Sequence, residues 1–305
     1  MNNTITSVKG LTAGHFTDLN AGTGCTVVLA RNGASASVAI RGGSPGTRET
    51  DLLSPERRIN KIHGIMLAGS SAFGLATADG ALTYLRTQGV GHQIGENLVP
   101  IVPAAILYDL NYKSNITLTA DHGVIACEAA SKDPLTTGAV GAGTGATVAK
   151  TNGSINSKKG GIGCACITLN SGIKVAAVVA VNSYGSIYHY QSGSPVAIPI
   201  NAAPDYNPLD PSTFSLQDDG DETGNTTIGI IATDADINKS EANYIAGIAH
   251  DGLALSIKPC HTMRDGDTLF AIGTGETPAA FDIDELGIAA VNVTAQAVLS
   301  AVTDL

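Results

Sequence analysis

The sequence is poor in charge, and above all in positive charge. Only 14% of its 305 residues are charged, where soluble domains usually carry about 25%. The 17 Lys and Arg stand against 27 Asp and Glu, which gives a net charge of −10 and leaves no basic run for nucleic-acid phosphates. Fewer charges also mean less surface that must stay in water. We therefore expect no nucleic-acid partner, and we expect copies of the chain to assemble into a homo-oligomer.

Signals for export, membrane insertion and metal binding are also missing. The first residues lack the basic and apolar regions of a signal peptide, and no run approaches the ~20 apolar residues of a membrane span. Five cysteines, an odd number without an export signal, indicate reduced thiols in a cytoplasmic protein. Cys164 and Cys166 are not followed by a second Cys or His cluster, and the seven histidines form no close pair. We therefore expect no metal site, no membrane contact and no Ser-His-Asp triad.

The apolar segments are short and read mostly as strands, which is typical of a layered α/β protein. Thr26–Ala30 and Ser37–Ile40 are predicted as two strands separated by an Asn32-Gly33 turn. The glycine-rich segment Gly141–Thr147 lacks the Lys-Ser/Thr of a P-loop and the full G-x-G-x-x-G pattern. We expect a tight turn there, in which backbones approach closely, rather than a phosphate cradle for a cofactor.

One segment differs sharply from the rest in composition. Residues 188–224 contain five prolines and six acidic residues with few apolar ones, which predicts a long surface linker. A fully apolar strand, Ile228–Ala232, follows almost at once. A hydroxyl at Thr226 therefore lies where an N-terminal nucleophile would sit. Cleavage after Asn225 would free an α-amino group of pKa about 7.7–8.0, which can act as base for that hydroxyl. Taken alone, an Asn-Thr pair before a strand is far more often an ordinary turn than a cleavage site.

An acidic motif follows further along the chain. Asp265-Gly266-Asp267 precedes the predicted strand Thr268–Ile272 and lies 265 − 226 = 39 residues beyond Thr226. A strand–helix–strand passage of that length could return the motif to the side of Thr226. Two close carboxylates can orient a hydroxyl or hold an ammonium, and one of them can have a raised pKa. A plain Asp-Gly turn with solvated acids is the structural alternative.

Seven segments, taken in chain order, resemble one enzyme family over nearly the full chain. They are GTRETDLL (46–53), HGIMLAGSSAFGLATADG (63–80), VPIVPAAILYDL (99–110), GAGTGAT (141–147), KGGIG (159–163), NTTIGIIATDA (225–235) and HTMRDGDTLFAIGTG (261–275). Their combination is similar to the self-processing aminopeptidase/esterase–amidase family, which includes D-aminopeptidases, β-aminopeptidases and nylon-oligomer (6-aminohexanoate-oligomer) hydrolases. A threonine paired with a D-G-D motif most resembles the nylon-oligomer branch.

The resemblance implies both a fold and a maturation step. The fold is a four-layer αββα sandwich, similar to that of N-terminal-nucleophile hydrolases, formed by a single domain over 1–305. The maturation step is self-cleavage between Asn225 and Thr226. It would leave an α subunit of residues 1–225 and a β subunit of residues 226–305, which is 305 − 225 = 80 residues. The two subunits stay together, and several αβ pairs associate.

The resemblance also implies roles for side chains besides the nucleophile Thr226. They are Asp265 and Asp267 as orienting acids, Lys159 (or the adjacent Lys158) as the active-site lysine, Asn182 as the oxyanion-hole amide, and Tyr108 as a candidate for the active-site tyrosine. An amide donor can stabilise a developing oxyanion, and a lysine can lower the pKa of a nearby amine or donate a hydrogen bond. A satisfied asparagine at a strand end and a solvent lysine are the structural alternatives.

We therefore expect a self-processed amide hydrolase without a cofactor, acting on small peptides, amino-acid amides or esters, or ω-amino-acid oligomers. Two alternatives stay open. One is acyl transfer of the ornithine acetyltransferase type, because that family also cuts before a threonine and shares the broad fold. The other is a non-processed binding protein of the same fold. The D-G-D segment favours the hydrolase, and an intact single band on a denaturing gel would favour the binding protein.

Overall fold

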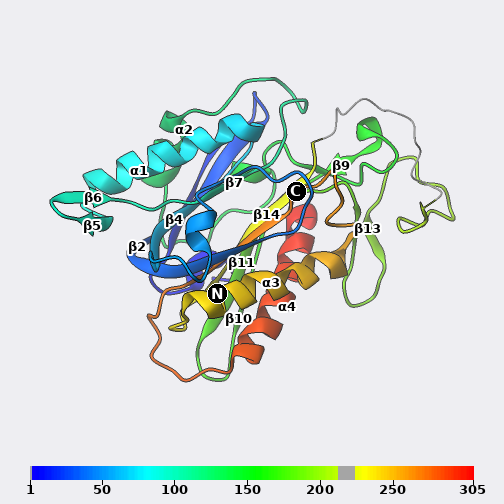
Figure 1. Ribbon diagram of the computed structural model, residues 1–305. Coiled ribbons are helices and arrows are strands. Elements are labelled where there is room, and N and C mark those ends of the chain that lie inside the picture. The colour runs from blue at the N-terminus through cyan, green and yellow to red at the C-terminus, as the bar shows by residue number, and fades with distance from the viewer. Residues whose placement is uncertain (1, 212–223) are drawn as a thin grey trace.

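The computed structural model describes residues 2–211 and 224–305, and within them a nine-stranded sheet forms the centre of the molecule (Figure 1). The strands follow the order β10-β11-β14-β16-β2-β4-β7-β3, and β1 pairs with β2. Their bounds are β1 Thr12–Asp18, β2 Thr23–Ile40, β3 Thr47–Arg48, β4 Lys61–Ala68, β7 Ala104–Ile106, β10 Gly161–Thr168, β11 Lys174–Asn182, β14 Thr226–Thr233 and β16 Thr268–Gly273.

The long strand β2 joins the two halves of this sheet. Its first part pairs with β1 and β4, and its last part, from Ser35 to Ile40, pairs with β16. The predicted turn at Asn32-Gly33 is wrong: the strand continues through it with a register shift between Leu29 and Ala34. Gly33 has φ +76, so the Asn-Gly pair supplies the left-handed backbone of a bulge instead of a hairpin.

Three apolar cores separate four layers, which confirms the predicted αββα architecture. Alternate side chains of β14 face opposite cores: Ile228 and Ile230 lie between the two halves of the sheet, whereas Ile231 packs under helices. The helices α3 and α4 cover that outer face, and α1 and α2 cover the outer face of β2 and β4 (Figure 1). The helix bounds are α1 Thr77–Thr87, α2 Ala120–Glu128, α3 Lys239–Ser256 and α4 Ile283–Thr303.

Short elements connect these layers. They are 3-10 helices at Ile5–Ser7, Asp51–Leu53, Ser71–Ala76, Gly141–Gly143 and Ser154–Asn156, and strands β5 His92–Ile94, β6 Asn97–Val99, β8 Thr147–Val148, β9 Lys158–Lys159, β12 Ser186–Tyr188, β13 Pro195–Ala197 and β15 Ile257–Lys258. The glycine-rich segment forms the expected tight turn. Gly143 approaches the backbone of Ile162 so closely that a side chain at Gly143 would collide with it. The predicted linker is not wholly irregular: β13 pairs with β12, and residues 212–223 lie outside the described residues.

Helix α4 qualifies the expectation that no segment could span a membrane. Its 21 residues have a mean hydropathy of 1.6 over an 18-residue window, which is long and apolar enough by composition. Within the described chain, 56% of that window is buried. The helix packs against β10, β11 and α3, with Val293, Ala297 and Val298 in the shared core. This is the environment of a core helix in a layered protein.

The connection between β14 and β16 brings the predicted site residues to one edge of the sheet. The two strands are parallel neighbours joined through α3, so both begin at the same edge of the sheet. Strand β11 is antiparallel to β14 and ends at this edge, where Asn182 pairs with Thr226. Three strand ends therefore meet at one point.

Candidate active site

Thr226 begins β14 and is almost closed off from solvent, with 4% of its surface exposed. Its hydroxyl donates a hydrogen bond to the carbonyl oxygen of Asn225, the residue just before it. The same carbonyl oxygen accepts a hydrogen bond from the backbone N–H of Gly266 at 3.0 Å. A nucleophile-type hydroxyl thus lies against a peptide carbonyl that is already polarised by a fixed donor.

The acidic motif lies directly beside this threonine. Asp265 forms a parallel bridge with Asn225, and the Asp267 carboxylate accepts a 2.8 Å hydrogen bond from the backbone N–H of Thr227. A side chain on Gly266 would place its Cβ 2.8 Å from the Thr226 hydroxyl oxygen. Only glycine leaves room for the turn to approach the hydroxyl this closely.

Both aspartates are buried, each with 1% of its surface exposed. Burial, followed by the negative charge of Asp267, raises the pKa of Asp265 to about 6. Hydrogen bonds from the Thr262 side chain and the Tyr184 backbone N–H oppose that rise, at 2.5 Å and 3.2 Å. Asp265 can therefore exchange a proton near neutral pH.

Asn182 lies at the end of β11 with every polar group of its side chain occupied. Its Oδ1 accepts from the Thr147 backbone N–H and from the Lys150 ammonium, each at 2.9 Å. Its Nδ2 donates to the carbonyl oxygens of Tyr108 at 2.9 Å and Gly224 at 3.2 Å. The amide is rigidly aimed at the chain segment that leads into Thr226.

Lys150 is a residue of this site that the sequence reasoning missed. Its Nζ donates to Asn182 Oδ1, to the Asn182 carbonyl at 3.2 Å and to the Gly224 carbonyl at 3.3 Å. Only 5% of its surface is exposed, and burial lowers its pKa to about 7, although the charge of Asp265 opposes this. The signal in the sequence was weak: a lysine that directly follows the small apolar segment Ala146–Ala149.

The structure does not bring Lys159, the predicted active-site lysine, to Asn182. Its Nζ donates to the carbonyl oxygens of Gly143, Ala146 and Gly160 at 3.1, 2.7 and 2.7 Å. Within the described residues, these carbonyls are its hydrogen-bond acceptors, and the adjacent Lys158 is exposed. The lysine that contacts Asn182 is therefore Lys150, nine positions earlier in the sequence.

Tyr108, the candidate tyrosine, does border the site. Its carbonyl oxygen holds Asn182 Nδ2, and a side chain on Gly224 would collide with its ring. The Tyr108 side chain therefore packs directly against the backbone of Gly224, which comes just before the Asn225–Thr226 bond in the chain.

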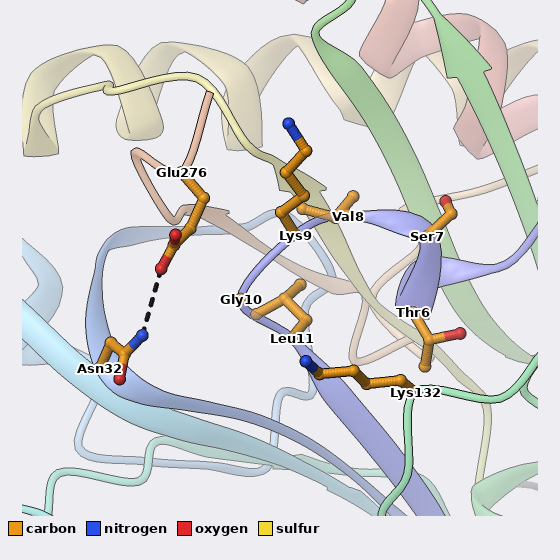
Figure 2. Close-up of a pocket in the computed structure, with 9 residues that line it drawn as sticks. All are labelled: Thr6, Ser7, Val8, Lys9, Gly10, Leu11, Asn32, Lys132 and Glu276. Atoms are coloured by element: carbon orange, nitrogen blue, oxygen red, sulfur yellow. Dashed lines mark hydrogen bonds between the residues drawn. The ribbon is translucent and has the colours of Figure 1, made fainter. Parts of the chain in front are cut away.

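The hollow drawn in Figure 2 lies away from this cluster. It has a volume of about 390 Å³ and is lined by Lys9, Lys132 and Glu276, with Asn32 Nδ2 donating to Glu276 Oε1 at 3.1 Å. Glu276 follows the far end of β16, where Gly273 pairs with Thr233, and this end lies seven residues or about 23 Å along β14 from Thr226. Across residues 2–211 and 224–305 there is also no group of three or more His, Cys, Asp or Glu that could hold a metal ion.

Comparison with known proteins identifies the family of the chain. The model of peptidase family S58 matches residues 3–304. An uncharacterized aminopeptidase of Mycobacterium leprae (strain TN) is 38% identical, over 98% of this chain and 90% of its own length. The 6-aminohexanoate-oligomer endohydrolase of Paenarthrobacter ureafaciens is 31% identical, over 83% of this chain and 70% of its own length.

A solved structure supports the architecture independently. The L-aminopeptidase D-Ala-esterase/amidase of Ochrobactrum anthropi, described as a variant among the Ntn hydrolase fold, superposes with a TM-score of 0.72. The match covers 98% of this chain and 85% of that chain at 18% identity, so it concerns the fold. With a family match over nearly its whole length and aminopeptidases among its relatives, the chain belongs to peptidase family S58, a family of peptide and amide hydrolases.

Proposed function

We propose that this protein is a self-processing amide hydrolase in which Thr226 first cuts the Asn225–Thr226 bond and then serves as the N-terminal nucleophile. The observation that carries the proposal is the contact of the Thr226 hydroxyl with the carbonyl of Asn225. That carbonyl is the group the hydroxyl must attack to cut the chain before itself. The N–H of Gly266, 3.0 Å away, is placed to hold the oxygen as it becomes negative.

The cleavage needs a base, because Thr226 has no free amine while the chain is intact. Lys150 fits this role: its pKa of about 7 leaves a large neutral fraction at physiological pH, and it contacts the Gly224 carbonyl next to the reacting peptide. The hydroxyl oxygen attacks the Asn225 carbonyl carbon and its proton passes to the base. The C–N bond then breaks, the Thr226 nitrogen takes up a proton, and water hydrolyses the resulting ester.

After cleavage the same groups serve an external substrate. The new α-amine of Thr226, with a usual pKa of about 7.7–8.0, acts as base for its own hydroxyl. Departure of the segment that ends at Asn225 would free Asn182 Nδ2 and Lys150 Nζ from the Gly224 carbonyl. These donors can then hold a substrate carbonyl, and one oxyanion donor is typically worth about 2.7–4 kcal/mol.

For the substrate we propose N-terminal residues of small peptides, amino-acid amides or esters, with 6-aminohexanoate oligomers as the second class. The order follows the relatives: the mycobacterial aminopeptidase is 38% identical to this chain and the oligomer endohydrolase 31%. Acyl transfer to an amine, as in ornithine acetyltransferases, would instead give hydroxylamine- or amine-trapped products faster than hydrolysis.

The test compares two adjacent threonines. Wild type, Thr226→Val and Thr227→Val are purified and followed by intact mass and N-terminal sequencing. We expect wild type and Thr227→Val to give fragments of 225 and 80 residues, the smaller beginning TTIGII or TVIGII. Thr227 is a matched control, because its buried hydroxyl has no hydrogen-bond partner among the described residues. Thr226→Val should stay intact and inactive on p-nitroanilides of amino acids. An intact wild type, or a cleaved Thr226→Val, would refute the proposal.

A further inference from the structure

A histidine lies directly behind the acidic motif, in the loop between β15 and β16. His261 donates two hydrogen bonds to one oxygen of Asp267, from its backbone N–H at 3.0 Å and from ring Nδ1 at 2.7 Å. The other oxygen of Asp267 accepts from the backbone N–H of Thr227, next to the nucleophile. Asp267 therefore links the histidine to the first residues of β14.

The backbone of His261 is held in an unfavourable conformation. Its φ is +58, in the left-handed region that glycine adopts readily and that only a few per cent of other residues occupy, with histidine, asparagine and aspartate the most frequent among them. Such a residue persists only where its surroundings fix it, and left-handed histidines are therefore informative about function. In this position the ring and the backbone N–H converge on the same carboxylate oxygen.

We propose that His261 is a positioning residue for the hydrolase reaction: its ring Nδ1 and backbone N–H fix the Asp267 carboxylate against β14, and its positive charge weakens the repulsion between the two acids beside Thr226. This inference rests on the proposed function, because it concerns the two acids of that reaction. His261 is the one histidine to which we assign a role in the proposed reaction.

The charges around the pair support this role. Hydrogen bonds and the charge of Asp267 raise the pKa of His261 to about 10, although burial opposes the rise, so the ring is cationic at neutral pH. His250 contacts the ring edge-on with centroids 4.8 Å apart, and burial lowers its pKa to about 4, so it adds no charge. The neighbouring Cys260 also raises the pKa of His261, and the charge of Arg41 lowers that of His250.

The role also follows from electrostatics. Burial and, after it, the negative charge of Asp267 raise the pKa of Asp265, so a cation beside Asp267 weakens the second of these effects. The His261 imidazolium neutralises Asp267 and so limits the rise at Asp265. Removal of its charge strengthens the repulsion between the acids, and Asp265 then holds its proton to a higher pH.

The first experiment separates the charge of His261 from its hydrogen bond. His261→Asn suits the left-handed backbone, and its amide nitrogen can donate to Asp267 as Nδ1 does, without a charge. His261→Gly keeps the backbone and removes the side chain. His92→Asn, in the exposed hairpin β5–β6, is the matched control. For each, kcat and KM of the processed enzyme are measured from pH 5 to 9.

We expect His261→Asn to move the acidic midpoint of kcat to higher pH with KM within twofold of wild type and kcat restored near pH 9. His261→Gly should lower kcat by roughly 10²-fold at every pH, in the range of acid–base contributions. His92→Asn should match wild type. A His261→Asn profile that superposes on that of wild type would overturn the proposal.

A second measurement does not depend on cleavage or activity. In uncut Thr226→Val protein, the titration of His261 is followed by NMR of histidine ring carbons, with His261→Asn identifying its signal. We expect the ring to stay protonated above pH 8, and to titrate near its ordinary value in Asp267→Asn. Titration of His261 near pH 6.5 in Thr226→Val would overturn the role of His261 even if wild type processes itself. A high pKa of His261 in Thr226→Val, together with a wild type that never cleaves, would instead refute only the proposed function.

Discussion

Two lysines near the site, the buried Lys150 and the half-buried Lys159, differ in the acceptors that surround each ammonium group. Burial lowers the pKa of both, to about 7 and about 8. Lys159 donates to the backbone carbonyls of Gly143 and Ala146, within the glycine-rich segment, and to that of Gly160. Lys150 donates to the side chain of Asn182 and to the carbonyl of Gly224, on the segment that leads into Thr226.

The difference teaches that burial and a perturbed pKa alone do not mark a functional lysine. Fixed backbone acceptors can use all the donors of an ammonium and leave it a purely structural group. An acceptor on the segment that ends at Asn225 would be withdrawn by the proposed cleavage, which would leave Lys150 free to act. The following variants test this distinction.

The largest expected effect is on self-cleavage. Lys150→Met should slow the appearance of the 80-residue fragment by about 10²–10⁴-fold, because it removes the proposed base. Lys159→Met, with the same change of side chain, should process within a few-fold of wild type. For both variants, the appearance of the fragment is followed on denaturing gels after the unfolded protein is diluted into refolding buffer. Equal rates for the two variants would erase the distinction between the lysines.

A second comparison concerns turnover by the mature enzyme. Asn182→Ala should lower kcat by about 10²–10³-fold, because it removes an oxyanion donor. Thr144 lies between Gly143 and Ala146, whose carbonyls accept from Lys159. Thr144→Val loses only a 2.6 Å hydrogen bond to the carbonyl of Gly141 and should keep kcat within twofold. Steady-state rates on an amino-acid p-nitroanilide measure both. An unchanged kcat in Asn182→Ala would remove this amide from the mechanism.

A third comparison reverses the order of the lysines, because it measures stability. In the uncut Thr226→Val background, Lys159→Met should lower the free energy of unfolding by about 1–3 kcal/mol, since buried carbonyls lose their donor. Lys150→Met should lower it less, because burying that ammonium already costs much of what its hydrogen bonds return. Thermal unfolding followed by circular dichroism gives both values. A larger loss in Lys150→Met would make that lysine the structural one.

The smallest effect couples the two regions. Cleavage should increase as pH rises through about 7, because the neutral amine of Lys150 is the base. The positive charge of Lys159 helps to lower the pKa of Lys150, so Lys159→Met should move the midpoint to slightly higher pH. Cleavage rates from pH 5.5 to 9 test this. A midpoint that moves to lower pH would contradict the assumed coupling.

Most of the fold could be predicted because its signals are local. Apolar runs such as the one in β11, followed by turn residues, set the strand positions, and the family resemblance supplied their layering. The continuous strand β2 could not be predicted, because an Asn-Gly pair supplies positive φ equally well to a hairpin or a bulge. Only the pairing of its last part with β16 decides between them.

The site residues at the ends of strands were predicted from the sequence. Lys150, whose side chain extends into the site from another segment, was missed. Thr226, Asn182 and the acidic motif meet because three neighbouring strands begin or end there. The choice between Lys150 and Lys159 depends on which way two flexible side chains extend, and short-range sequence patterns do not encode that direction. His261 lies within the matched segment 261–275, but its contact with Asp267 depends on a left-handed backbone that the sequence does not predict.

The near-complete burial of Thr226 has a consequence for how such an enzyme matures. With hydroxyl, target carbonyl and oxyanion donor in one folded chain, the proposed cut is unimolecular, so its half-life should not depend on protein concentration. A mature molecule could not cut an inactive one in trans, because the bond is shielded by the sheet edge. Each molecule would act as its own zymogen, competent only after folding is complete.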